Sequence, residues 1–143
     1  MIFQLDKRLE KDCFKLAETE HCLWLLLNNK YFPWFIIVPK TETIELFQLS
    51  SAQQLNLQKE TNLLSAFIQY AFTIDKLNIA SIGNIVQQMH VHIIGRSQSD
   101  LCWPGVVWGC SHHEEYPHKE AQEIKEKLMF FCKEQAFNNI QYI

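Results

Sequence analysis

Two histidines one residue apart, His90 and His92, stand in the apolar segment QQMHVHIIGR at residues 87–96. Gln88 precedes them at the same spacing of two. Successive side chains of a β-strand point to opposite faces, so these three polar side chains would share one face of a strand. Neighbours on that face lie about 7 Å apart, which lets two imidazoles reach adjacent atoms of one ligand.

This spacing is compatible with three kinds of site. The simplest is no functional site at all, only a half-exposed strand with ordinary polar residues on its solvent-facing side. Short motifs often match by chance, which favours this interpretation. The second is a metal site, whose further ligands would be Cys102, Cys110, His112 and His113. Zinc is disfavoured because seven residues separate the two cysteines, whereas structural zinc sites use a much tighter pair. We therefore expect no metal ligands here.

The third kind of site is one for nucleophilic catalysis. A neutral imidazole has one bare nitrogen that can attack an electrophile, while its N–H needs an acceptor that fixes the tautomer. A second histidine can donate a proton or a hydrogen bond to the leaving oxygen, which is typically worth about 10²–10⁴ in rate. The spacing alone does not choose among the three possibilities.

The elements around the motif predict an α+β fold. Apolar runs at residues 21–27 and 34–38 predict two strands, separated by the turn-rich sequence NNKYFP. Ser50 followed by Gln53 is a capping-box signature, and the apolar spacing after it predicts a long helix over residues 51–74.

The second half of the chain continues this pattern. Residues 77–82 and 86–95 predict strands, with a turn at Gly83-Asn84 between them. A loop rich in Trp, Gly and Pro follows, and Pro117 opens a C-terminal helix. The order predicts one domain over residues 1–143, in which a mainly antiparallel sheet packs against a long central helix and a C-terminal helix.

Composition narrows the function classes. With 143 residues and 48% hydrophobic content the chain is typical of a single globular domain. A net charge of −3 gives no basic footprint for DNA or RNA. No apolar run is long enough to cross a membrane. The five cysteines are odd in number and include no CxxC, which disfavours a disulfide framework and favours the reducing cytoplasm.

The segment from Gly83 to Ile94 resembles the signature of the histidine triad (HIT) superfamily, in which His-φ-His-φ-His-φ-φ follows a Gly-Gln-Ser/Thr-Val stretch and φ is apolar. The sequence WFIIVPK at residues 34–40 looks like the family's second core strand. CWPG at residues 102–105 resembles a Trp-Pro segment that some branches carry after the motif. The resemblance covers most of residues 20–110. Within the family, the chain resembles bacterial diadenosine tetraphosphate hydrolase-like members.

This resemblance implies an enzyme that binds nucleotides and acts at the α-phosphorus of a dinucleoside polyphosphate or a nucleoside phosphoramidate. His90 matches the middle histidine, the nucleophile that forms a covalent nucleotidyl-histidine. His92 matches the third histidine, which bonds to a phosphate or bridging oxygen. Asn84 matches a phosphate-contacting Gln, and Asn28 is the candidate for the ribose hydroxyls, with Asn29 as the neighbouring alternative.

Three positions depart from the family pattern. Gln88 replaces the first histidine, where the family generally uses the main-chain carbonyl to hold the N–H of the nucleophile, and a carbonyl survives a change of side chain. Ile85 stands where a phosphate-binding Ser or Thr often sits, which leaves its backbone N–H to bind phosphate. Trp34 stands where several branches carry another histidine. These departures motivate a competing hypothesis, a nucleotide-binding module with little catalysis; a zinc protein is a third.

Partners and neighbouring residues follow the same resemblance. We expect a small-molecule nucleotide as the partner, no required cofactor although a divalent cation can accompany a polyphosphate, and a homodimer, as in many members of the family. Arg96 directly after the motif is a candidate either for a distal phosphate or for an ordinary surface charge. Trp103 and Trp108 are predicted to cap the core, and Cys102 and Cys110 to be inert thiols.

Overall fold

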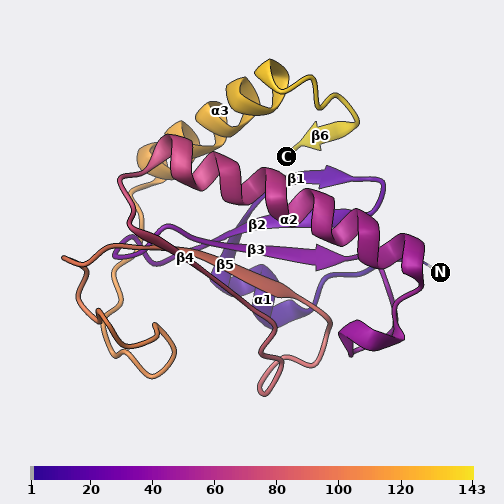
Figure 1. Ribbon diagram of the computed structural model, residues 1–143, viewed down its shortest axis with the longest axis horizontal. Coiled ribbons are helices and arrows are strands. Elements are labelled where there is room, and N and C mark those ends of the chain that lie inside the picture. Colours follow the sequence, from indigo (N-terminus) through magenta and orange to yellow (C-terminus); the bar gives the residue numbers. More distant parts are fainter. Residues whose placement is uncertain (1) are drawn as a thin grey trace.

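The computed structural model, which describes residues 2–143, is built on a six-stranded antiparallel sheet (Figure 1). The strand order is β4-β5-β3-β2-β1-β6. The strands are β1 (Cys13–Thr19), β2 (Cys22–Leu27), β3 (Trp34–Pro39), β4 (Lys76–Ala80), β5 (Val91–Arg96) and β6 (Ile140–Tyr142). The helices are α1 (Lys7–Asp12), the short 3-10 helix η1 (Leu46–Gln48), α2 (Ser51–Ala71) and α3 (His118–Glu134). The predicted α+β class, with its long central and C-terminal helices, is confirmed.

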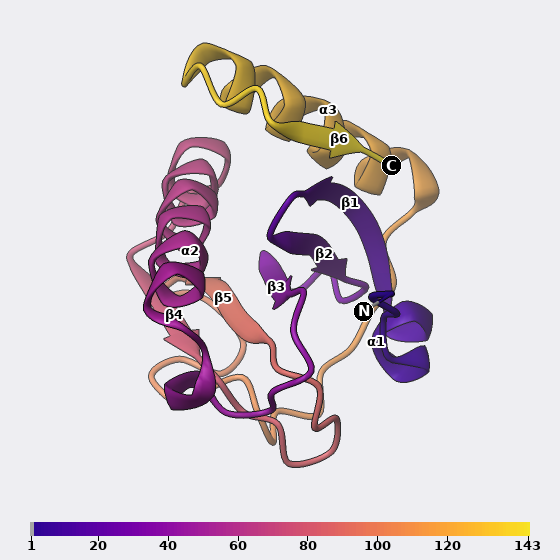
Figure 2. The same ribbon diagram turned by 90° about the vertical axis from the view of Figure 1, so that its right-hand side faces the viewer.

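Each face of the sheet has its own apolar core. Figure 2 shows α2 and α3 on one side of the sheet and α1 on the other. Trp24, Phe35 and Ile93 point into the core beneath α2 and α3. Leu25 and Ile94, their neighbours in the strands, point into the core that includes α1. Because β2, β3 and β5 are covered on both faces, their sequences are almost continuously apolar.

The central helix is fixed at its start and along its length. The side chains of Ser50 and Gln53 form the predicted capping box, which satisfies backbone groups at the first turn. Further along, the buried carboxylate of Glu60 accepts hydrogen bonds from Trp24 Nε1 at 2.7 Å and Thr19 Oγ1 at 2.8 Å. These bonds tie α2 to strands β1 and β2. The helix ends at Ala71 rather than at the predicted residue 74.

The strand that carries the histidine motif is shorter than predicted. Its pairing with β3 runs from Trp34↔Ile94 to Ile37↔Val91. Continued in the same register, the ladder would reach Pro39, which has no N–H to donate. The prediction of a strand over residues 86–95 was therefore wrong at its start, and residues 81–90 form a loop between β4 and β5.

Helix α1 and strands β1 and β6 were not predicted from the sequence. Strand β1 mixes polar and apolar residues and is interrupted by a register shift between Lys15 and Ala17, so it shows no clean alternation. Strand β6 has only three residues and pairs with the edge of β1. Among residues 2–143, none of the helices has the length and apolar character needed to cross a bilayer.

Candidate active site

The loop between β4 and β5 encloses a cavity of about 390 Å³. The loop contributes eight of the residues around it, and the segment before η1 contributes the others. Its lining residues are Ile44, Glu45, Ser81, Ile82, Gly83, Asn84, Gln87, Gln88, Met89 and His90. None of these side chains carries a positive charge of the Lys or Arg type. We call this the His90 cavity.

His90 is held in one tautomer by the backbone. Its Nδ1 lies 2.6 Å from the carbonyl oxygen of Gln88. Because a carbonyl only accepts, Nδ1 must carry the proton, and the neutral ring then has a bare Nε2. The residue is only 4% exposed, yet it lines the cavity. This arrangement presents a bare ring nitrogen in a fixed direction.

His92 is held in the opposite tautomer. The indole Nε1 of Trp34 lies 2.9 Å from Nδ1 of His92, and an indole N–H can only donate. Nδ1 of His92 is therefore bare, and the neutral ring carries its proton on Nε2. The rings of His90 and His92 are neighbours, with centroids 4.9 Å apart. His92 itself does not line the His90 cavity, but its ring packs against that of His90.

The surroundings of His92 favour its neutral form. Burial lowers the pKa of His92 to about 4, with a further lowering from the neighbouring His90 and a smaller opposing effect from a hydrogen bond to the backbone of Ile82. The ring is 8% exposed, and Trp34 and Trp108 both meet it edge-on. Near neutral pH, His92 is therefore a hydrogen-bond donor rather than a cation.

The side chain of Gln88 turns away from the two histidines. Its Oε1 accepts a hydrogen bond from the backbone N–H of Asp6 at 2.8 Å, and its Nε2 donates to the carbonyl of Gln4 at 2.9 Å. The expectation that the three polar side chains share one strand face was wrong for Gln88, because this part of the chain is not a strand. An amide can donate and accept at once, so Gln88 clamps the N-terminal segment while its carbonyl orients His90.

The turn beside His90 offers free backbone groups. Gly83 and Asn84 line the cavity, whereas the side chain of Ile85 is 74% exposed and does not. The backbone of Gly83 lies close to the backbone of Val86: a Cβ added at Gly83 would be only 3.0 Å from the Val86 carbonyl oxygen. Within residues 2–143, no loop backbone–backbone hydrogen bond uses an N–H from residues 82–87. Successive free amides of this kind can bind an anion.

The two asparagines proposed for ribose lie elsewhere. Asn28 lines a second cavity, of about 360 Å³, together with Lys11, Asp12, Leu27, His113 and Glu115. Its Oδ1 accepts the N–H of Tyr116 at 2.8 Å. Asn29 is buried, and its side chain bonds to backbone groups of Tyr31, His112 and Glu114. The structure therefore does not bring either asparagine into the His90 cavity, and both hold the segment that leads to α3.

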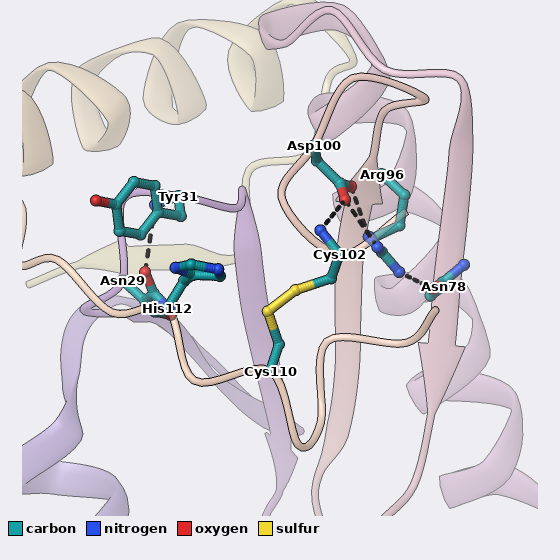
Figure 3. Close-up of a disulfide and its surroundings, with 8 residues drawn as sticks. All are labelled: Asn29, Tyr31, Asn78, Arg96, Asp100, Cys102, Cys110 and His112. Atoms are coloured by element: carbon teal, nitrogen blue, oxygen red, sulfur yellow. Dashed lines mark hydrogen bonds and ion pairs between the residues drawn. A yellow bond between two sulfur atoms is a disulfide. The ribbon is translucent and has the colours of Figure 1, made fainter. Parts of the chain in front are cut away.

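Arg96 is neither a surface charge nor a phosphate contact. It is 1% exposed, its guanidinium donates to both oxygens of Asp100 at 2.8 and 3.0 Å, and it also donates to Asn78 at 2.9 Å (Figure 3). Burial raises the pKa of Asp100, but the bonds from Arg96 and from the amides of Ser97 and Cys102 outweigh it and leave this pKa lowered. The guanidinium also stacks near Phe32 and Trp103. Arg96 thus fixes the loop that follows β5.

The same loop contains a bond that the cysteine count argued against. Cys102 and Cys110 form a disulfide (Figure 3), with their Cα atoms 6.4 Å apart, a usual separation for a disulfide. The prediction of inert thiols was therefore wrong for this pair, because the two residues stand at the ends of one short loop. Cys13, Cys22 and Cys132 are free. Trp108, inside the loop, packs against His92 and Trp34.

A metal site finds no support in the described part of the chain. Across residues 2–143, no three His, Cys, Asp or Glu side chains gather closely enough to hold an ion. His112 and His113 are exposed, and Nε2 of His113 bonds to the backbone of Asn28. The sulfur atoms of Cys102 and Cys110 are bonded to each other.

Comparison with known proteins agrees with this geometry. A model of the HIT domain matches residues 8–99. The structure is similar to that of a histidine triad (HIT) protein from Sinorhizobium meliloti 1021, with 39% identity, a TM-score of 0.86, and coverage of 90% of this chain and 96% of that one. A histidine triad protein from Marinobacter aquaeolei VT8 matches with 38% identity, a TM-score of 0.88 and coverage of 94% and 98%.

More distant structures share the fold alone. A hypothetical histidine triad nucleotide-binding protein from Sulfolobus tokodaii strain7 is 17% identical, with a TM-score of 0.66 and coverage of 87% of both chains. No curated protein matches the chain. Because the domain model spans more than half of the chain and two solved relatives match it along nearly their whole length, the chain belongs to the histidine triad (HIT) family.

Proposed function

We propose that this chain is a nucleotide hydrolase that acts at the α-phosphorus of a dinucleoside polyphosphate or a nucleoside phosphoramidate. One observation carries the proposal. Nδ1 of His90 is held by the Gln88 carbonyl at 2.6 Å beside the His90 cavity, which leaves Nε2 bare to attack phosphorus. The product of that attack would be a covalent nucleotidyl-histidine, and water would then release the nucleotide.

The free amides of the turn would hold the phosphate. We assign this role to the side chain of Asn84 and to the backbone N–H of Ile85, beside the close approach at Gly83. Because Glu45 is the one charged side chain that lines the cavity, a divalent cation bound to a polyphosphate would offset repulsion there. No resident cofactor is proposed.

The nucleoside half of the substrate is assigned to the second cavity. Asn28 lines it, and its side-chain amide is our candidate contact for the ribose hydroxyls. We propose a small nucleotide, rather than DNA or RNA, as the partner. For the assembled protein we propose a homodimer, with the segment CWPGVVW at residues 102–108 as part of the interface, because Val106 is exposed there. Light scattering at several protein concentrations measures the assembly directly.

A turnover panel tests the enzymatic proposal. Wild-type protein is mixed with a dinucleoside polyphosphate and with adenosine phosphoramidate, and release of nucleoside monophosphate is followed with and without Mg²⁺. His90→Ala is the matched variant, and mass spectrometry of peptides kept at alkaline pH, where a P–N bond survives, locates any adduct. We expect monophosphate release by the wild type alone. Absence of both turnover and adduct on His90 contradicts the proposal.

The second candidate function is a nucleotide-binding module without meaningful catalysis. The observation that favours it is the absence of Lys and Arg among the residues lining the His90 cavity, which leaves little to stabilise charge in a transition state. This alternative predicts saturable nucleotide binding and the same background turnover in wild type and His90→Ala.

A further inference from the structure

Trp34 and His92 form a pair whose polarity is fixed by the indole. In the register of β3 and β5, Ile36 stands opposite His92 and Trp34 stands opposite Ile94. Trp34 is therefore the diagonal neighbour of His92 on the same face of the sheet, within reach of an aromatic side chain. Its N–H donates to Nδ1 of His92 over 2.9 Å. A buried indole N–H needs such an acceptor.

The pair leaves His92 little freedom. Trp34 is wedged edge-on against Phe32 and Trp108 as well as His92, so the indole cannot turn away without repacking this core. Placing a proton on Nδ1 of His92 would set two donors against each other and leave the buried indole without a partner. The backbone hydrogen bond to Ile82 raises the pKa of His92, so the group it meets is a carbonyl that accepts from Nε2–H. Ile82 lines the His90 cavity, where a leaving oxygen would replace this carbonyl as the acceptor.

We propose that Trp34 is a positioning residue that locks His92 as a neutral Nε2–H donor, and that this restricts the enzyme to leaving groups that depart as anions. The inference rests on the proposed role of His90 as the nucleophile. It selects, from the two substrate classes proposed above, the dinucleoside polyphosphate over the phosphoramidate.

The bond changes explain the selection. Nε2 of His90 forms a bond to the α-phosphorus while the bond from phosphorus to the bridging oxygen breaks. The electron pair stays on that oxygen, which leaves as a phosphate anion and accepts the His92 hydrogen bond without taking the proton. A water oxygen then attacks phosphorus, the electron pair of the P–N bond returns to His90, and one water proton is released.

An amine leaving group requires a proton, whereas a phosphate leaving group does not. The nitrogen must gain a proton as its bond to phosphorus breaks, since an amide anion is far too basic to leave. A neutral Nε2–H gives up its proton only by becoming an imidazolate. Burial and His90 also lower the pKa of His92 to about 4, so little imidazolium is present near neutral pH to serve instead.

Trp34→Phe tests the positioning role, because it keeps an aromatic ring and removes the donor. The measured quantity is the ratio of kcat/KM for a dinucleoside polyphosphate to that for adenosine phosphoramidate. We expect the wild type to favour the polyphosphate and the ratio to fall about three- to tenfold in Trp34→Phe, the range for one hydrogen bond. A purely structural role would lower both values together and leave the ratio unchanged, which would overturn the inference.

Trp108→Phe is the matched control. Trp108 also meets the ring of His92 edge-on, at 5.2 Å between centroids, but the hydrogen bond to Nδ1 comes from Trp34. The ratio should therefore stay at the wild-type value in Trp108→Phe.

Nitrogen NMR of ¹⁵N-histidine-labelled protein at neutral pH separates this inference from the proposed function. It distinguishes a bare ring nitrogen from a protonated one, and the expected result is a bare Nδ1 and a protonated Nε2 on His92. A protonated Nδ1 overturns the role of Trp34 whatever the turnover. Conversely, if His92 has the expected tautomer but no substrate is turned over, the positioning role of Trp34 is supported and the proposed hydrolase function is refuted.

Discussion

The two neighbouring histidines are held in opposite tautomers although they are chemically identical. A carbonyl acceptor at Gln88 places the proton of His90 on Nδ1, whereas an indole donor at Trp34 places the proton of His92 on Nε2. The tautomer of each ring is therefore set by the group that bonds to its Nδ1. This division needs no charge on either ring, which suits a buried site where charging a side chain is costly.

The first prediction separates the backbone of Gln88 from its side chain. Gln88→Ala keeps the carbonyl that orients His90, so turnover should stay within about tenfold of wild type. The same change removes the bonds to Gln4 and Asp6 and should lower the free energy of unfolding by about 1–3 kcal/mol. His90→Ala should lose turnover by about 10³-fold or more, as expected of a nucleophile. Steady-state kinetics and urea unfolding measure both effects.

Gln87→Ala is the matched control for stability. Gln87 is the exposed neighbour of Gln88, so its truncation should change the free energy of unfolding by less than about 0.5 kcal/mol. Equal loss of activity in Gln88→Ala and His90→Ala, with both variants folded, would show that the side chain of Gln88 matters as much as its backbone.

The second prediction concerns acid. Folded His92 has a pKa of about 4, below its ordinary value of 6.5, so the unfolded chain binds the proton more tightly. Acidification below about pH 6.5 should therefore favour unfolding, and this contribution should level off below about pH 4. Between pH 7 and pH 4.5 the loss from this residue is on the order of 2 kcal/mol.

Urea unfolding of wild type and His92→Asn across this range isolates the contribution. Asn can still accept a hydrogen bond from Trp34 but does not titrate, so the wild type should lose more stability on acidification than the variant. Parallel pH profiles for the two proteins would mean that His92 has an ordinary pKa in the folded state.

At this scale the sequence predicted a local contact but not the distant ones. The predicted contact between the carbonyl of Gln88 and the N–H of His90 is confirmed, because the two residues are close in the sequence, whereas the role of His90 as the nucleophile stays a prediction. The motif did not indicate where the Gln88 amide points or what Trp34 does. Their partners are 82 to 84 and 58 residues away in the chain, and a local pattern contains no information about such distant neighbours.

Among the elements, those defined by local chemistry were predicted most accurately. The helix after Ser50 begins where its capping box predicts. Strand β5 begins five residues later than predicted, at Val91 instead of residue 86, because the limit is set by Pro39 in a partner strand. The disulfide was missed for the same reason, since it depends on how the loop after β5 folds back.

The third prediction tests what fixes that loop. Asp100→Ala would leave the guanidinium of Arg96 buried and without its carboxylate, and breaking a buried pair in this way costs about 3–5 kcal/mol. The loop also contains Trp108, which packs on His92, so turnover should fall as well. Urea unfolding gives the first quantity and steady-state kinetics the second.

Asp75→Ala provides the comparison. Asp75 also binds this loop, through the N–H of Gln98 at 2.8 Å, but that contact is exposed. Its loss should cost no more than about 1 kcal/mol. If the two variants unfold at the same urea concentration, Arg96 must find compensating partners when Asp100 is removed, and the loop is held by something other than this pair.

In the whole molecule, the sheet forms the apolar cores and the loops form the cavities. Strands β2, β3 and β5 lie between two apolar cores, whereas both cavities are lined by loops and element ends. The class of fold could be predicted because apolar runs and a capped helix specify it. The separation of the two cavities could not, since it depends on how the segments at residues 81–90 and 110–117 are placed on the finished sheet.

The fourth prediction uses hydrogen exchange of the intact chain, with and without adenosine monophosphate. Amides of β2, β3 and β5 should exchange only through global unfolding, because their hydrogen bonds are buried on both faces. Amides of residues 82–87 should exchange quickly in the free protein, since they lack loop backbone partners. Bound nucleotide should slow exchange at these residues, and His90→Ala should keep this protection because the mutation leaves the amides in place.

The pattern of protection also decides how the nucleotide lies. Slowing at residues 82–87 alone would place the phosphate in the His90 cavity and leave Asn28 as a purely structural residue that holds Tyr116. Slowing at residues 112–116 as well would require a ligand that reaches the second cavity, as the proposed ribose contact demands. Slowing at residues 112–116 without change at 82–87 would separate nucleotide binding from His90, and the nucleophilic role could not then be retained.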